Sequence, residues 1–250
     1  MPHSNIQIFE NLDDLSGAAA RRFEALAREK ASRGEIFSAA LSGGSTPRRL
    51  YQMLADPALR IAWDRIHLFQ VDERCVPPDD SESNYRMIRE ALLDRVPIPK
   101  ANFHRMAAER DDGEEVAREY SAELASVLQP KAGEWPRFDL IFLGMGADGH
   151  TASLFPSSPA LQERKLWVCP NYSERLGKHR ITLTFPILNA ASEIIFLVSG
   201  EDKAETLCQV LEGPPGSFPA QGVKPLNGLL TWLVDKGSTR LLGRTAGRTS

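Results

Sequence analysis

Short apolar runs that alternate with helical stripes constrain the fold of this chain more than any other feature. Residues 36–41, 66–71 and 138–143 are nearly all apolar, and each run is followed by glycines or charged residues. Elsewhere apolar residues recur at helical spacing, as across residues 15–26 and 116–127. Strands without polar residues are typical of parallel sheets covered by helices. The sequence therefore predicts an α/β fold: an open, mostly parallel, Rossmann-like sheet with helices on both faces.

Further elements follow from the same periodicity. Strands are predicted at residues 166–169, 180–184 and 194–198, and helices from Pro47 onward, at 84–93, at 201–211 and at 226–234. No repeat or low-complexity linker interrupts the pattern, although 250 residues would allow two small domains. We therefore expect one domain over residues 1–242, followed by a flexible tail over residues 243–250.

The charge balance excludes a broadly basic surface. The chain has 30 Lys and Arg against 33 Asp and Glu, so it has no surplus for binding nucleic acid, and an anionic ligand would need a local cationic pocket. No apolar run approaches the roughly 18 residues of a membrane span, and residues 1–11 do not resemble a signal peptide. The three cysteines (Cys75, Cys169 and Cys208) are far apart and odd in number, which favours reduced thiols and a cytoplasmic location.

Three polar loops follow predicted strands, at residues 42–47, 72–80 and 144–153. In open parallel sheets, ligands bind in the crevice beyond the carboxyl ends of the strands. We therefore expect the three loops to converge on one crevice.

The first loop has the composition of an anion site. Gly43 and Gly44 allow a tight turn and a close approach of the backbone to a ligand. Thr46 suits the N-cap of the next helix and Pro47 its first position, so amides of residues 43–46, including that of Ser45, would point at a phosphate. An ordinary strand–turn–helix junction is the alternative. The loop is not a Walker motif, because the lysine is missing.

The second loop and a later segment supply charges. Asp72 and the neighbouring Glu73 could act as acid, base or hydroxyl acceptor, and Arg74 could hold a phosphate. A solvated turn is the alternative, and Asn84 could equally cap a helix. Lys178 and Arg180 precede a predicted strand, where they would be surface charges unless they lie beside the phosphate loop.

The third loop contains a literal G-x-G-x-x-G pattern in Gly144, Gly146 and Gly149. A dinucleotide site would need a carboxylate about 20 residues further on to bind the ribose. Residues 168–170 offer none, and Asp148 would repel a pyrophosphate. The sequence therefore argues against NAD binding.

His150 in the same loop is the strongest candidate for a catalytic base, because an imidazole titrates near neutrality and can accept a proton from water. Asp148 lies two residues away and could orient the imidazole or a substrate hydroxyl. A histidine that only caps the following helix is the alternative. No His and Cys cluster has the spacing of zinc ligands, so no metal site is expected.

Together these segments resemble the 6-phosphogluconolactonase family, the soluble α/β type related to the glucosamine-6-phosphate isomerase/deaminase family. The matching pieces are Ser42-Gly43-Gly44-Ser45-Thr46-Pro47, Asp72-Glu73-Arg74 with Ser83-Asn84, residues 144–156, and Arg180-Ile181-Thr182-Leu183-Thr184. The resemblance implies a sugar-phosphate isomerase-type fold. It also implies hydrolysis of 6-phospho-D-glucono-1,5-lactone to 6-phosphogluconate in the oxidative pentose phosphate pathway. It implies a small sugar-phosphate lactone as substrate, no cofactor and no obligate protein partner.

Two alternatives and one departure remain. In the deaminases, the resemblance places a catalytic glutamate five residues after the histidine, where this chain has Phe155. A non-catalytic sugar-phosphate sensor would have no need of an intact Asp148 and His150 pair. The family usually has Pro-Ala-Ser near the C-terminus, whereas this chain has Pro219-Ala220-Gln221, which puts any role of that serine in doubt.

Overall fold

The computed structural model describes residues 5–243 and confirms the predicted α/β class. Its main sheet is parallel throughout and has seven strands in the order β1-β10-β9-β6-β2-β3-β5. Their bounds are β1 Asn5–Phe9, β10 Leu229–Asp235, β9 Glu193–Val198, β6 Leu140–Gly144, β2 Phe37–Leu41, β3 Ile66–Gln70 and β5 Phe103–His104.

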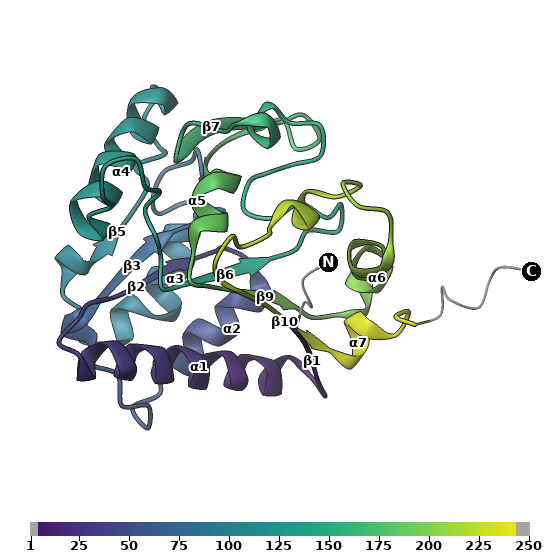
Figure 1. The fold of residues 1–250 in the computed structure, drawn as a ribbon, viewed down its shortest axis with the longest axis horizontal. Coiled ribbons are helices and arrows are strands. Elements are labelled where there is room, and N and C mark those ends of the chain that lie inside the picture. Colours follow the sequence, from purple (N-terminus) through teal and green to yellow (C-terminus); the bar gives the residue numbers. More distant parts are fainter. Residues whose placement is uncertain (1–4, 244–250) are drawn as a thin grey trace, which may run out of the picture.

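Helices cover both faces of this sheet (Figure 1). One face carries α1 Leu12–Ser32, α2 Ser45–Leu54 and α3 Asn84–Ala91, and the other carries α4 Gly113–Leu128, α5 Phe185–Ala190 and α6 Ala204–Glu212, while α7 Lys236–Thr239 follows β10. Short 3₁₀ turns are η1 Trp63–Arg65, η2 Leu93–Arg95, η3 Lys100–Asn102, η4 Pro159–Gln162, η5 Glu201–Lys203 and η6 Pro219–Gly222. Along β2, Ala39 and Leu41 join the core under α1 while Ala40 joins the opposite core. Because both faces are buried, the central strands need apolar residues at every position.

A second, antiparallel sheet was not predicted. It consists of β4 Asp72–Arg74, β8 Lys178–Leu183 and β7 Val168–Ser173 in the order β4-β8-β7. The expectation of a loop from residue 72 was therefore wrong at its start, because these three polar residues pair with a strand more than 100 positions away. Local periodicity carries no information on such a distant partner.

The predicted helix at residues 226–234 was also wrong, since β10 occupies most of this stretch. The run from Leu229 to Val234 is apolar and short, and a buried strand of this kind cannot be told from a helix by periodicity alone. The edge strand β1 was missed because it is mostly exposed, with Ile8 57% accessible, and lacks the apolar signature of the central strands.

The strand order creates a crevice between β2 and β6. From β2 the chain moves outward through β3 to β5, and after its return to β6 it moves the opposite way through β9 to β10. The connections that leave the carboxyl ends of β2 and β6 therefore diverge. Ligands bind at such a switch point in open α/β sheets.

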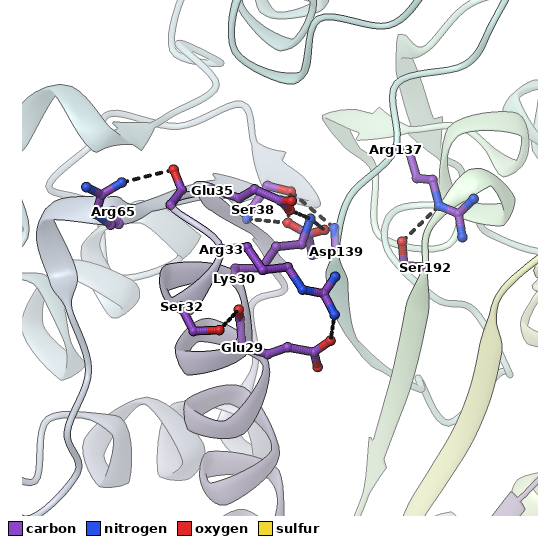
Figure 2. Close-up of polar contacts among 11 residues, drawn as sticks. Glu29, Lys30, Ser32, Arg33, Glu35, Ser38, Arg65, Arg137, Asp139 and Ser192 are labelled. Atoms are coloured by element: carbon purple, nitrogen blue, oxygen red, sulfur yellow. Dashed lines mark hydrogen bonds and ion pairs between the residues drawn. The ribbon is translucent and has the colours of Figure 1, made fainter.

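A polar clasp joins β2 to β6 at the opposite, amino-terminal edge (Figure 2). One carboxylate oxygen of Asp139 accepts hydrogen bonds from the Ser38 amide and hydroxyl, at 2.9 and 3.0 Å. The other oxygen pairs with Lys30 of α1 at 2.9 Å, and Lys30 also reaches Glu35 at 3.0 Å. The clasp fixes the position of the start of β2 relative to that of β6, and hence where the loops that follow these strands emerge at the far edge.

Within residues 5–243, no helix combines the length and the apolar content that a membrane crossing requires. Of the predicted tail, only Gly243 lies within the described residues. The single domain over residues 1–242 stays a prediction.

Candidate active site

The polar loops meet around a cavity of about 250 Å³ at the carboxyl edge of the main sheet. Its walls come from the loops after β2, β6 and β9, and from β4 and β8 of the small sheet. Nine of the residues predicted to act in catalysis or in binding the substrate line it: Gly43, Gly44, Ser45, Thr46, Asp72, Arg74, Asn84, His150 and Arg180.

The amino-terminal end of α2 forms one wall. The helix begins at Ser45 with Gly44 as its N-cap, so the predicted cap at Thr46 was wrong. Gly44 has φ of 112°, a conformation that glycine adopts without strain, and this turns the chain two residues earlier than expected. No side chain caps these amides and the first turn has no acidic residue. Amides without an intrahelical acceptor, together with the helix dipole, favour an anion here.

Steric crowding requires a glycine at position 43. A Cβ at this position would lie 1.7 Å from Oδ1 of Asn84, so only glycine permits the packing of the loop against α3. Asn84 in turn donates to the Asp72 carbonyl at 2.9 Å. The first loop and β4 are thus held together at the cavity wall.

Two arginines without carboxylate partners face each other on the small sheet. Arg74 of β4 stands directly opposite Arg180 of β8, and among the described residues neither forms an ion pair. Arg180 is buried, and burial together with the charge of Arg74 lowers the pKa of its guanidinium. Like charges opposite each other on paired strands are destabilising. Both side chains line the cavity, where an anion would relieve this repulsion.

Asp72 and Glu73 have separate tasks, because adjacent residues of a strand point to opposite sides. Asp72 lines the cavity and accepts a hydrogen bond from the Ser153 hydroxyl at 2.6 Å. Glu73 does not line it. Its buried carboxylate accepts the backbone N–H groups of Arg74, Asn84 and Tyr85 at 2.7–2.8 Å, and burial raises its pKa. Glu73 therefore anchors the start of α3.

His150 is paired with Asp148, as the sequence suggested. Nδ1 of His150 lies 2.5 Å from Oδ1 of Asp148, and this hydrogen bond holds the pKa of the Asp148 carboxyl well below its usual range. An ionised carboxylate only accepts hydrogen bonds, so Nδ1 carries the proton and Nε2 is left as the acceptor. His150 lines the cavity whereas Asp148 lies behind it. Of the two candidate carboxylates, Asp148 contacts the imidazole and Asp72 does not.

The loop that carries this pair is tightly constrained. A Cβ on Gly146 would lie 2.1 Å from Nδ1 of His150, so glycine makes room for the imidazole. Ala152 adopts φ of 50°, which is unusual for a residue other than glycine and often marks a functional site. From outside, the Ala220 amide donates to the Gly149 carbonyl at 3.0 Å. The loop that carries the imidazole is therefore tied to η6 through its backbone.

Two further positions bear on the choice of chemistry. The ring centroid of Phe155 lies 4.7 Å from that of His150, and Phe155 lines the cavity. This wall is therefore apolar at the position where the sequence resemblance places a glutamate in the deaminases. Gln221 lies outside the cavity. Its side chain accepts from the Ser217 amide and donates to the Val210 and Pro214 carbonyls, so it ties η6 to the end of α6.

The cations also differ in part from those that the sequence suggested. Lys178 forms an ion pair with Glu82 and does not line the cavity. Lys203 of η5 does line it, and sequence analysis missed it. The signal was available, because η5 follows β9, a fourth strand that ends at the same edge of the sheet. Leu176 also lines the cavity, and nothing in the sequence marks it. Among residues 5–243, no cluster of three or more His, Cys, Asp or Glu is arranged to hold a metal ion.

Comparisons with known proteins identify relatives of the chain. The family model described as glucosamine-6-phosphate isomerases/6-phosphogluconolactonase matches residues 10–232. A 6-phosphogluconolactonase of Synechocystis is 46% identical over 201 residues, covering 79% of this chain and 81% of that protein, and one of Nostoc is 42% identical, covering 80% and 82%. The structure of the 6-phosphogluconolactonase from Trypanosoma brucei is 30% identical with a TM-score of 0.85, covering 96% of this chain and 99% of that one.

Replacing Glu73 by Gln tests the anchor of α3. The amide side chain keeps one of the two acceptor oxygens and turns an NH₂ group toward backbone N–H groups. We expect Glu73→Gln to lower the free energy of unfolding by about 2–3 kcal/mol, as measured by urea denaturation. The exposed Glu119→Gln is the matched control and should stay within about 0.5 kcal/mol of the wild type. Equal stability of the two variants would contradict the anchor.

Proposed function

The chain belongs to the family of glucosamine-6-phosphate isomerases and 6-phosphogluconolactonases, and we propose that it hydrolyses 6-phospho-D-glucono-1,5-lactone to 6-phosphogluconate. This reaction is a step of the oxidative pentose phosphate pathway. The observation that carries the proposal is a single cavity that holds an imidazole paired with a carboxylate and, on another wall, two arginines without carboxylate partners. In one small molecule, the imidazole would face the reacting ester and the two arginines would face the phosphate.

The phosphate of the substrate is proposed to lie among the cations. Amides of residues 43–46 and the guanidinium groups of Arg74 and Arg180 offer charge-assisted donors, and Arg suits a phosphate because its donors form a fork. Lys203 also lines the cavity and adds a third positive charge to its wall, although its ammonium pairs with Asp202 at 3.3 Å. Lys178, engaged by Glu82, is left out of this proposal.

The base is proposed to be His150. Its Nε2 takes a proton from water, and the water oxygen attacks C1 of the lactone. The carbonyl oxygen then carries a negative charge, which loop amides or a cavity cation stabilise. As the C1–O bond of the ring breaks, the imidazolium returns the proton to the departing ring oxygen. Asp148 is proposed to fix the tautomer throughout, and Asp72, which lines the cavity, to accept a hydrogen bond from a sugar hydroxyl.

The apolar wall at Phe155 favours hydrolysis over deamination. Ring opening and isomerisation of an amino sugar need an additional proton-transferring group, whereas lactone hydrolysis needs one base, one water and stabilisation of the oxyanion. The intact His150 and Asp148 pair favours an enzyme over a sensor. A cytoplasmic location is part of the proposal and is supported by the sparse, odd number of cysteines.

Product analysis tests the reaction class. Purified protein should convert the phosphorylated lactone to the acid faster than spontaneous hydrolysis, at a rate proportional to protein concentration. With glucosamine 6-phosphate it should release no ammonia, because Phe155 stands in place of the glutamate. Ammonia release that scales with protein concentration would overturn the proposal.

Arg180→Ala tests the phosphate site. Loss of charge-assisted hydrogen bonds, worth roughly 1.5–3 kcal/mol each, should raise KM for the phosphorylated lactone by about one to two orders of magnitude. Lys178→Ala, two residues away on the same strand, is the matched control and should change KM by less than about two-fold because its ammonium pairs with Glu82. If the two variants show the same KM, Arg180 does not hold the phosphate.

His150→Ala tests the base. General-base catalysis contributes about 10²–10⁴-fold, so kcat should fall by that order while KM stays within a few-fold. His179→Ala, an exposed histidine outside the cavity, should keep near-full activity.

The pH profile carries the same test. In the wild type, kcat/KM should fall as the pH drops below neutrality, because an imidazolium cannot accept a proton. The pKa of Asp148 is held well below its usual range, so its carboxylate stays ionised across this fall. A folded His150→Ala variant with near-full kcat, after subtraction of spontaneous hydrolysis, would place the base elsewhere.

A further inference from the structure

A third side chain completes the pair formed by His150 and Asp148. Arg175 reaches Asp148 from the turn between β7 and β8, with Nη1 lying 3.2 Å from Oδ2. Each carboxylate oxygen of Asp148 therefore has its own partner, since Oδ1 accepts from the imidazole at 2.5 Å and Oδ2 faces the guanidinium. The sequence gives no hint of this contact, because residue 175 lies in a polar turn between two short strands.

The turn that carries Arg175 is well defined. Ser173 and Lys178 pair across the two strands, the Leu176 amide donates to the Ser173 carbonyl at 3.2 Å, and Gly177 adopts φ of 61°. The next residue, Leu176, lines the cavity. Arg175 is thus presented by a segment that is itself a wall of the candidate active site.

The charges around His150 come from several elements. Asp148 lies on its own loop and Arg175 on the β7–β8 turn, while Asp72 and Arg74 of β4, Arg180 of β8 and Lys203 of η5 line the same cavity. Under the proposed function, a bound phosphate neutralises Arg74 and Arg180. Arg175 acts instead on Asp148, because its guanidinium shares the carboxylate that would otherwise interact with the imidazolium alone.

We propose that Arg175 is a positioning residue for the base. By occupying Oδ2 of Asp148 it keeps Oδ1 on the Nδ1–H of His150, so that Nε2 remains the acceptor, and its charge opposes protonation of the imidazole. A carboxylate alone stabilises the imidazolium and would leave less of the neutral base near pH 7. The guanidinium offsets part of this stabilisation. The inference rests on the proposed role of His150 in lactone hydrolysis.

The direct test follows the titration of His150 by NMR. The imidazole Cε1–H signal is assigned as the one that disappears in His150→Gln, and its titration midpoint is measured in the wild type and in Arg175→Gln. Removal of a nearby positive charge favours the imidazolium. The midpoint should therefore rise by about half a pH unit, because Arg175 is largely exposed and solvent screens its charge.

Two further variants control the measurement. Arg175→Lys keeps the charge and should bring the midpoint back toward the wild-type value. Arg33→Gln removes an equally charged, exposed arginine that pairs with Glu29 at 2.6 Å at the end of α1 (Figure 2), and should leave the midpoint unchanged. A midpoint in Arg175→Gln within about 0.1 pH unit of the wild type would overturn the proposal. So would a rise that Arg33→Gln reproduces or that Arg175→Lys does not reverse.

Kinetics then separate this inference from the proposed function. In Arg175→Gln the acid limb of the kcat/KM profile should move to higher pH together with the NMR midpoint, while KM at pH 8 stays within about two-fold. An acid limb that stays at the wild-type pH while the NMR midpoint moves would overturn the positioning role. If the wild type does not hydrolyse the lactone, the proposed function fails, whereas the NMR comparison still decides whether Arg175 controls the protonation of His150.

Discussion

The parallel pairing of β2 with β6 is the constraint on which the whole site depends. Only two residue pairs, Ala39 with Leu140 and Ala40 with Ile141, define the register, and the Asp139 clasp fixes it at the amino-terminal edge. A slip of one residue would turn every side chain of a strand to the opposite face and exchange two different cores. Because the chain leaves β2 and β6 in opposite directions, this one pairing sets the amino-terminal end of α2 opposite the loop of His150.

The small antiparallel sheet supplies the charged side chains of one cavity wall. Strand β4 separates its side chains, since Glu73 turns inward to hold α3 while Asp72 and Arg74 face the cavity. Its pairing with β8 then sets Arg74 against Arg180, an arrangement that costs stability in the absence of an anion. Such a conflict between local stability and charge is expected where a site is built for a ligand rather than for folding.

The sequence was informative where chemistry is local and uninformative where it depends on distant pairing. The convergence of the loops after β2, β3 and β6 follows from the rule that parallel strands share an edge, and the contact between Asp148 and His150 follows from their separation of two residues. The same approach could not separate Lys178 from Arg180, because residues two apart on a strand point to the same side. What distinguishes them is the ion pair of Lys178 with Glu82, a partner that comes close only in the folded chain. Nor could it show that Glu73 is structural, since its five backbone and side-chain donors come together only after β4 and α3 have packed.

The β7–β8 hairpin carries one residue for each end of the proposed substrate. Arg180, on β8, faces the cavity where the phosphate is proposed to bind, and Arg175, at the turn, contacts the carboxylate that orients the base. Leu176 between them forms part of the wall. In the proposed complex, this one short hairpin would therefore help to set the position of the reacting carbon relative to the phosphate. For this reason the phosphate would contribute to the orientation of the lactone carbonyl at His150 as well as to affinity, and a lactone without a phosphate would lose both.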